Sequence, residues 1–188
     1  MSMKITKSIV WSVLLMILVA SLYRIIPHRP LGFAPQLAIA IFAGAVIRNR
    51  LSAVLLPLLS MFVSDVIYQI LFINSLGSVP GFYEGQWVNY LLMAGVTLLS
   101  FLMNKVNLRN IATYSFIGPT AYFVVSNFLV WVSGAGWGRP KTISGLIQAL
   151  EDGLPFYRGS LISTLFFSMV LFGSWYLLYK KSESISVN

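Results

Sequence analysis

Hydrophobic residues run along this chain in six long blocks, separated by short segments rich in glycine, proline and charge. A transmembrane helix needs about 20 mainly apolar residues. The pattern predicts six such helices, with approximate bounds 8–26, 33–47, 51–76, 87–103, 111–132 and 160–179. We therefore expect an all-α polytopic membrane protein that forms a single transmembrane domain over residues 1–188.

The composition excludes an ordinary soluble domain. Hydrophobic residues make up 57% of the 188 residues and charged residues only 10%, whereas soluble proteins have about 45–50% and about 25%. The formal net charge is +8, but the basic residues lie between the apolar blocks. Membrane topology and anionic lipid headgroups explain that placement, so we expect the lipid bilayer as a partner and no nucleic acid.

The basic residues also predict the orientation of the helices. With six helices, one side carries eight Lys and Arg residues, near both termini and in the 47–51 and 103–111 connections, and the other side carries five. Cytoplasmic loops hold the excess, which places both termini inside, in the inner membrane of a bacterium. The first block also resembles a signal peptide, but its length and the following Arg24 favour a retained helix.

The connections predicted to face outward are the long ones. The last of them, residues 133–159, contains apolar residues at Ile143, Leu146, Ile147 and Leu150. This spacing is typical of an amphipathic helix. We expect a short helix over 143–150 that lies on the external face.

Two polar residues inside the apolar blocks are the leading candidates for a functional site. Asp65 is the only acid in any block, and an ionisable group at membrane depth is costly and usually functional. Asn127 lies on the fifth helix, which runs in the same direction as the third. Each follows a proline, Pro57 or Pro119, in a shared pattern P-x6-S-[DN]. At about 1.5 Å per residue both lie in the outer half of the membrane.

Aromatic and polar neighbours extend this candidate site. Tyr68 shares a helical face with Asp65, and Trp131 shares one with Asn127. An acid, an amide and aromatic walls suit a small, partly planar, polar or cationic solute. Three further residues, Gln36, Arg24 and His28, lie at external helix ends, where Arg24 and His28 can meet an anionic group.

Structural alternatives remain open for several of these residues. Asp65 can be a structural carboxylate paired with Arg24 or Arg29, and Asn127 can join helices by hydrogen bonds. Gln36 is also a reasonable first residue of a helix. The small-residue pattern Ala40-x-x-x-Gly44 predicts close packing between helices of the same chain.

Enzyme chemistry is not expected. The chain has no cysteine and one histidine, which leaves few nucleophile–base pairs and no multi-histidine metal site. No H-E-x-x-H, G-x-S-x-G or nucleotide-binding motif is present. We expect no catalytic residues, no metal and no cofactor.

Two resemblances extend this interpretation. The segments PHRPLGFAPQLAIAIFAGAVIRNRLSAVLLPLLSMFVSD, SNFLVWVSG and GLIQALEDGLPFYRGSL resemble an uncharacterised bacterial family of six-helix membrane proteins assigned to transport. In size and helix number the chain is also similar to the S components of energy-coupling-factor vitamin transporters. That similarity implies a vitamin- or micronutrient-like solute and a separate energising ATPase module. The alanine-x-x-x-alanine docking motif of S components is missing from the first helix, SIVWSVLLMILVASLYRII.

The sequence therefore favours a transport protein that binds a small solute in an outward-facing pocket. The alternative is a non-catalytic accessory subunit of a larger membrane complex, in which exposed aromatic residues contact other membrane subunits. The environment of Asp65 separates the two: a polar cavity favours transport, whereas a tightly packed ion pair favours the structural role.

Overall fold

The computed structural model describes residues 17–24, 26 and 30–185, and all the regular structure in this part of the chain is helical. A first helical segment covers residues 17–24. The later helices are α2 (Gln36–Val46), α3 (Arg50–Ile73), α4 (Trp87–Ser100), α5 (Leu108–Ser133) and α6 (Ile143–Ile185). The all-α expectation is thus confirmed. The predicted first helix, 8–26, lies partly outside the described residues.

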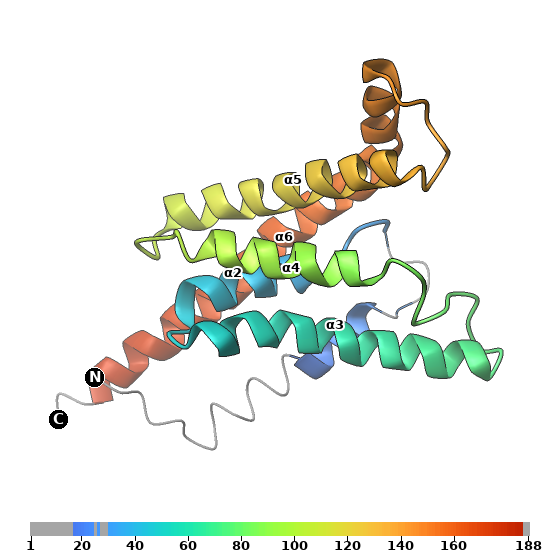
Figure 1. Cartoon of the computed structure of the whole chain (residues 1–188). Helices are drawn as coiled ribbons and strands as arrows, with labels where there is room; N and C mark the ends of the chain where they lie inside the picture. Colours follow the sequence, from blue (N-terminus) through green and yellow to red (C-terminus); the bar gives the residue numbers. More distant parts are fainter. Residues whose placement is uncertain (1–16, 25, 27–29, 186–188) are drawn as a thin grey trace.

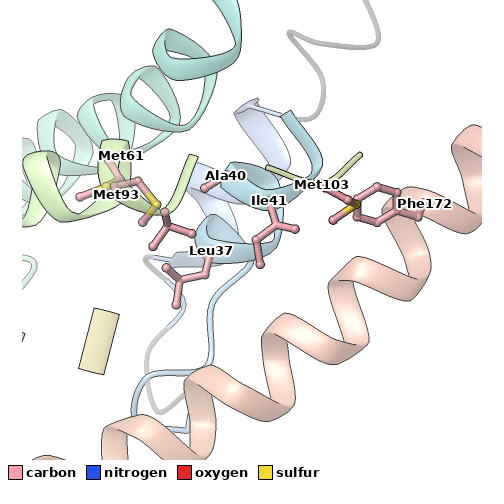
Figure 2. Packing of buried hydrophobic residues seen from close by; sticks show 8 residues of the cluster. Leu37, Ala40, Ile41, Met61, Met93, Met103 and Phe172 are labelled. Carbon is pink, nitrogen blue, oxygen red and sulfur yellow. The ribbon is translucent and has the colours of Figure 1, made fainter. Parts of the chain in front are cut away.

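The described helices form a bundle around α2 (Figure 1). α2 contacts α3, α4 and α6, and α5 more weakly, and most of its side chains are buried. Figure 2 shows three side chains of this helix lying between two methionines on one side and Met103 with Phe172 on the other. The labelled residues of α2 are Leu37, Ala40 and Ile41, and the two methionines are Met61 and Met93.

The small residues of α2 explain how an 11-residue helix reaches the centre of the bundle. A Cβ atom on Gly44 would lie 2.6 Å from the Thr97 carbonyl oxygen and 2.8 Å from the Ser100 Cβ. Only a residue without a side chain permits this approach of α2 to α4. The prediction that Ala40-x-x-x-Gly44 packs helices within the chain is confirmed.

Asparagine and glycine residues set several helix ends. The side chains of Asn49 and Asn107 accept hydrogen bonds from the backbone N–H groups of Ser52 and Asn110, which caps the first turns of α3 and α5. α5 ends at Gly134, whose φ of 76° is left-handed. These caps shift the bounds by one to three residues from those predicted, 51 and 111 at the start.

Three of the helices are long and apolar enough to cross a membrane. The three segments are Arg50–Ile73, Leu108–Ser133 and Ile143–Leu177, while the apolar helices α2 and α4 have only 11 and 14 residues. On α5 the large apolar side chains of Phe116, Val124 and Phe128 are about half exposed. A surface of this kind is usual for helices that face lipid.

The largest difference from the prediction concerns the end of the chain. The amphipathic helix over 143–150 and the sixth helix over 160–179 are one continuous element, α6, which contains Pro155. Figure 1 shows the first turns of α6 turned steeply away from the rest. Proline removes one backbone hydrogen bond and bends a helix without ending it when neighbours support both sides. Residues 151–159, which the sequence pattern predicted to be a loop between two helices, are therefore part of one helix.

Candidate functional site

A cavity of about 690 Å³ lies between the helices at the end of the bundle that carries the α3–α4 and α5–α6 connections. This volume is within the usual range for small-molecule sites, about 300–1,000 Å³. Its lining includes the polar side chains of Arg24, Gln36, Asn89, Tyr122, Asn127 and Tyr157.

Asp65 is buried beside this cavity but does not line it. The carboxylate pairs with the Arg24 guanidinium through Oδ1. Its Oδ2 accepts hydrogen bonds from Gln86 Nε2 at 2.5 Å and from the Tyr90 hydroxyl at 2.6 Å. Both oxygens are therefore satisfied by the protein. The pairing with Arg24 that the sequence allowed is present, and the alternative partner Arg29 lies outside the described residues.

Arg24 reaches the cavity wall from the first helical segment. Besides Asp65, its Nη1 donates to the Ser64 hydroxyl at 2.6 Å and to the Met61 carbonyl oxygen at 3.3 Å. Tyr68 does not line the cavity; its hydroxyl donates to the Arg24 carbonyl oxygen at 2.6 Å, and its ring centre lies 5.7 Å from the guanidinium carbon. Tyr68 thus holds Arg24 in position.

The α3–α4 connection is fastened to the same carboxylate. Gln86 bonds both Asp65 and the Gly81 carbonyl oxygen, the latter at 2.9 Å. Gln69 Oε1 accepts from the N–H groups of Gly81 and Phe82 at 3.1 and 3.2 Å. A Cβ on Gly81 would lie 1.9 Å from the Asp65 carbonyl oxygen, so glycine is required. The ion pair therefore fixes the loop that delivers Tyr83 to the cavity.

Asn127, a candidate site residue from the sequence, lines the cavity from α5. Its Nδ2 donates to the Phe123 carbonyl oxygen at 2.8 Å. Within the described part of the chain, no donor bonds its Oδ1. A Cβ on Gly153 of α6 would lie 2.5 Å from that oxygen. The missing side chain at Gly153 therefore makes the space that Asn127 occupies.

Gln36 also lines the cavity, although it is the first residue of α2 and is only 5% exposed. Its Nε2 donates to the Ala20 carbonyl oxygen at 3.3 Å. Its Oε1 has no hydrogen-bond partner among the described residues. A buried acceptor without a donor is costly, and it is the kind of group that a ligand can satisfy.

Of the two remaining predicted site residues, only Trp131 is described, and it does not line this cavity. Trp131 lines a smaller neighbouring cavity of about 180 Å³, and its Nε1 donates to the Pro140 carbonyl oxygen at 2.8 Å. The Arg139 guanidinium binds both carboxylate oxygens of Asp152 at 2.8 Å beside it. His28 lies outside the described residues.

Several lining residues were missed by the sequence argument. Asn89 on α4 donates from Nδ2 to the Tyr83 hydroxyl at 2.6 Å and accepts from the Tyr122 hydroxyl at 3.1 Å. The rings of Phe123 and Tyr157 stack with centres 4.6 Å apart. The sequence could have indicated Asn89 as a site residue, because, like Asn127, it is an amide inside an apolar block. No group of three or more potential metal ligands occurs among the residues described.

These features define a class of protein: a helical protein of membrane type with a polar cavity between its helices. The chain belongs to the family described as "Family of unknown function (DUF6580)", whose model matches residues 4–185. It matches none of the curated proteins and none of the solved structures. The family description assigns no activity and makes no connection to S components.

Proposed function

We propose that this protein crosses a membrane with six helices, keeps both chain ends on the cytoplasmic side, and binds a small solute for uptake. The observation that carries the proposal is the cavity of about 690 Å³ lined by Arg24, Gln36 and Asn127. The cavity lies at the end of the bundle with the fewer basic residues, which is the external end under the positive-inside rule.

The polar lining supports binding because polar groups at membrane depth are costly to maintain. Asn127 and Gln36 each present an acceptor oxygen that no described residue satisfies. An amide that served helix packing alone would be expected to have its oxygen bonded as well as its nitrogen. A solute that bonds these oxygens would recover the lost hydrogen-bond energy.

The proposal changes the expected role of Asp65. We now assign the charged group at the cavity wall to Arg24, with Asp65 as the counter-ion that orients it. The proposal keeps uptake of a micronutrient-like solute with a separate ATPase module, as in S components. It also keeps the bacterial inner membrane as the location of the protein. A stand-alone carrier would use the same cavity.

The accessory-subunit alternative has one specific observation in its favour. Asp65 is 1% exposed and fully paired, as a purely structural carboxylate would be. Under this alternative the cavity is filled by lipid or by another subunit, and the exposed apolar face of α5 contacts that subunit.

The test is mass spectrometry of small molecules that co-purify with the detergent-solubilised full-length protein. We compare wild type with Gly153→Val, which pushes a side chain against Asn127, and with Gly173→Val on the same helix. At Gly173 nothing lies within 4 Å of an added Cβ, so this variant controls for the substitution itself. A solute enriched with wild type and Gly173→Val but lost from Gly153→Val is expected.

A wild-type protein that carries no enriched solute would contradict the proposal and favour the accessory subunit. So would a solute retained equally by a folded Gly153→Val variant. Uptake of the identified solute into proteoliposomes, with and without a co-purifying ATPase, then separates transport from binding alone.

A further inference from the structure

The hydrogen atoms of the cavity hydroxyl groups are almost all in use. Five hydroxyl-bearing residues line the cavity: Tyr83, Tyr122, Ser126, Tyr157 and Ser160. Each hydroxyl has one proton to donate. Ser126 donates to the Phe123 carbonyl oxygen at 3.1 Å, Ser160 donates to the Gly32 carbonyl oxygen at 3.1 Å, and Tyr122 donates to Asn89.

The direction of the Tyr157 hydrogen bond follows from its partner. The hydroxyl oxygens of Tyr157 and Thr120 are 2.9 Å apart. Thr120 already gives its only proton to the Phe116 carbonyl oxygen at 2.6 Å, so Tyr157 must be the donor. Four of the five lining hydroxyls therefore offer only lone pairs, and Tyr83, which accepts from Asn89, is the exception.

The two amides add acceptors to the same wall. Asn127 Oδ1 and Gln36 Oε1 bond no donor among the described residues. Among the described residues, Asn89, Asn127 and Gln36 each keep one unbonded amide N–H, and Tyr83 keeps its hydroxyl proton. Outside the Arg24 guanidinium, the acceptors open to a ligand, four hydroxyl oxygens and two amide oxygens, therefore outnumber these four donors. Because a buried acceptor needs a donor, a fitting solute must supply N–H or O–H groups.

The charges near the cavity exclude a strong preference for an ion. Among the described residues that line the cavity, Arg24 is the only charged one, and its charge is balanced by Asp65. No carboxylate among the described lining residues is present to balance a bound cation. A bound anion would compete with Asp65 for the same guanidinium. It would also be repelled by the lone pairs of the lining hydroxyl and amide oxygens.

The aromatic side chains indicate the shape of the solute. Tyr83, Tyr122, Phe123, Phe156 and Tyr157 line the cavity. Flat apolar ring faces suit a planar ligand. We infer that the solute is a neutral, planar compound rich in N–H or O–H donors, bound by acceptor oxygens that include Asn127 Oδ1. This inference rests on the proposed solute-binding function.

The test uses three probes that share a bicyclic ring and differ in one group: 2-naphthamide, 2-naphthoate and 2-naphthylmethylammonium. Binding to the detergent-solubilised full-length protein is measured by equilibrium dialysis. We expect the neutral amide to bind about 3- to 10-fold tighter than either ion, the ratio that one net hydrogen bond supplies.

Variants of Asn127 localise the effect. Asn127→Leu removes the acceptor and should weaken naphthamide binding by about 3- to 10-fold. Asn110→Leu, the same change at the opposite end of α5, should leave it unchanged. Asn127→Asp adds a charge to the wall and should shift the preference toward the ammonium probe.

Tightest binding of naphthoate or of the ammonium probe to wild type would overturn the inference, and so would equal losses in the two leucine variants. Binding of no probe would overturn it as well. In that last case a solute that still co-purifies with wild type leaves the proposed function standing, whereas the absence of any solute removes both.

Discussion

At the scale of single residues, Asp65 shows how one buried charge can organise a site without entering it. Its carboxylate is 1% exposed and bonds residues from three segments: Arg24, Gln86 and Tyr90. Burying an unpaired carboxylate is very costly, but a paired and fully hydrogen-bonded one is tolerated. The Asp65 carboxylate therefore holds the first helical segment, the α3–α4 connection and α4 against α3.

This arrangement predicts strong coupling between the two charges. Arg24→Met or Asp65→Leu alone leaves an unpaired charge at depth and should lower the free energy of unfolding by about 3 kcal/mol. The double variant should be clearly more stable than the sum of the two losses predicts. Unfolding titrations of the purified protein with a denaturing detergent measure this cycle.

The partly exposed pair Arg139–Asp152 provides the matched control, because solvent reaches and screens it. Its double-mutant cycle, with Arg139→Met and Asp152→Leu, should show little coupling. Additive losses in the Arg24–Asp65 cycle would contradict the structural role of Asp65.

At the scale of helices, the small residues of α2 matter more than its length. An 11-residue helix covers about 16 Å, about half of a bilayer core of about 30 Å. Its place at the centre comes from close backbone approach, as at Gly44 against Thr97 and Ser100. The first two residues of this helix, Gln36 and Leu37, line the cavity.

Crowding at Gly44 is therefore expected to destabilise the bundle. Gly44→Val should lower the free energy of unfolding by about 1–3 kcal/mol, because its side chain overlaps backbone and side-chain atoms of α4. Gly95→Val is the control on α4, where nothing lies within 4 Å of an added Cβ. Equal stability of the two variants in the same detergent titration would contradict this packing.

The sequence predicted most helices because long apolar blocks and capping residues are local signals. It did not predict that 143–150 and 160–179 join into α6, because a proline at 155 signals an end or a bend equally well. The start of α2 at Gln36 rather than residue 33 reflects the preceding turn, where Gly32 has a φ of 70°. Turns of this kind depend on tertiary contacts, here with Phe156.

At the scale of the whole molecule, the candidate site was predicted only in part. Arg24, Gln36 and Asn127 line the main cavity, whereas Asp65, Tyr68 and Trp131 lie behind or beside it. Helical spacing gives the depth of a residue and the face it shares, but it does not give the rotation of that face relative to other helices. Asn89 and Tyr122 reach the cavity because α4 and α5 pack beside α2, which is a long-range property.

The same scale carries the prediction of orientation. The connections over 74–86 and 134–142 lie at one end of the bundle, and the basic connections over 47–49 and 101–107 lie at the other (Figure 1). The cavity lies at the former end, where Tyr83 of the 74–86 connection lines it. The chain has no cysteine, so a single introduced thiol reports one position without background. Ser78, Ala135 and Asn104 are exposed residues of three different connections and are suitable sites.

In intact spheroplasts, a membrane-impermeant maleimide should label Ser78→Cys and Ala135→Cys at once, because the positive-inside rule places these connections outside. Asn104→Cys lies beside Lys105 in a basic connection and should react only after the membrane is permeabilised. Equal labelling of all three after permeabilisation controls for thiol reactivity. The reverse pattern would mean that the cavity of about 690 Å³ opens to the cytoplasm. Solute would then enter it from inside the cell, and the proposed function would change from uptake to export.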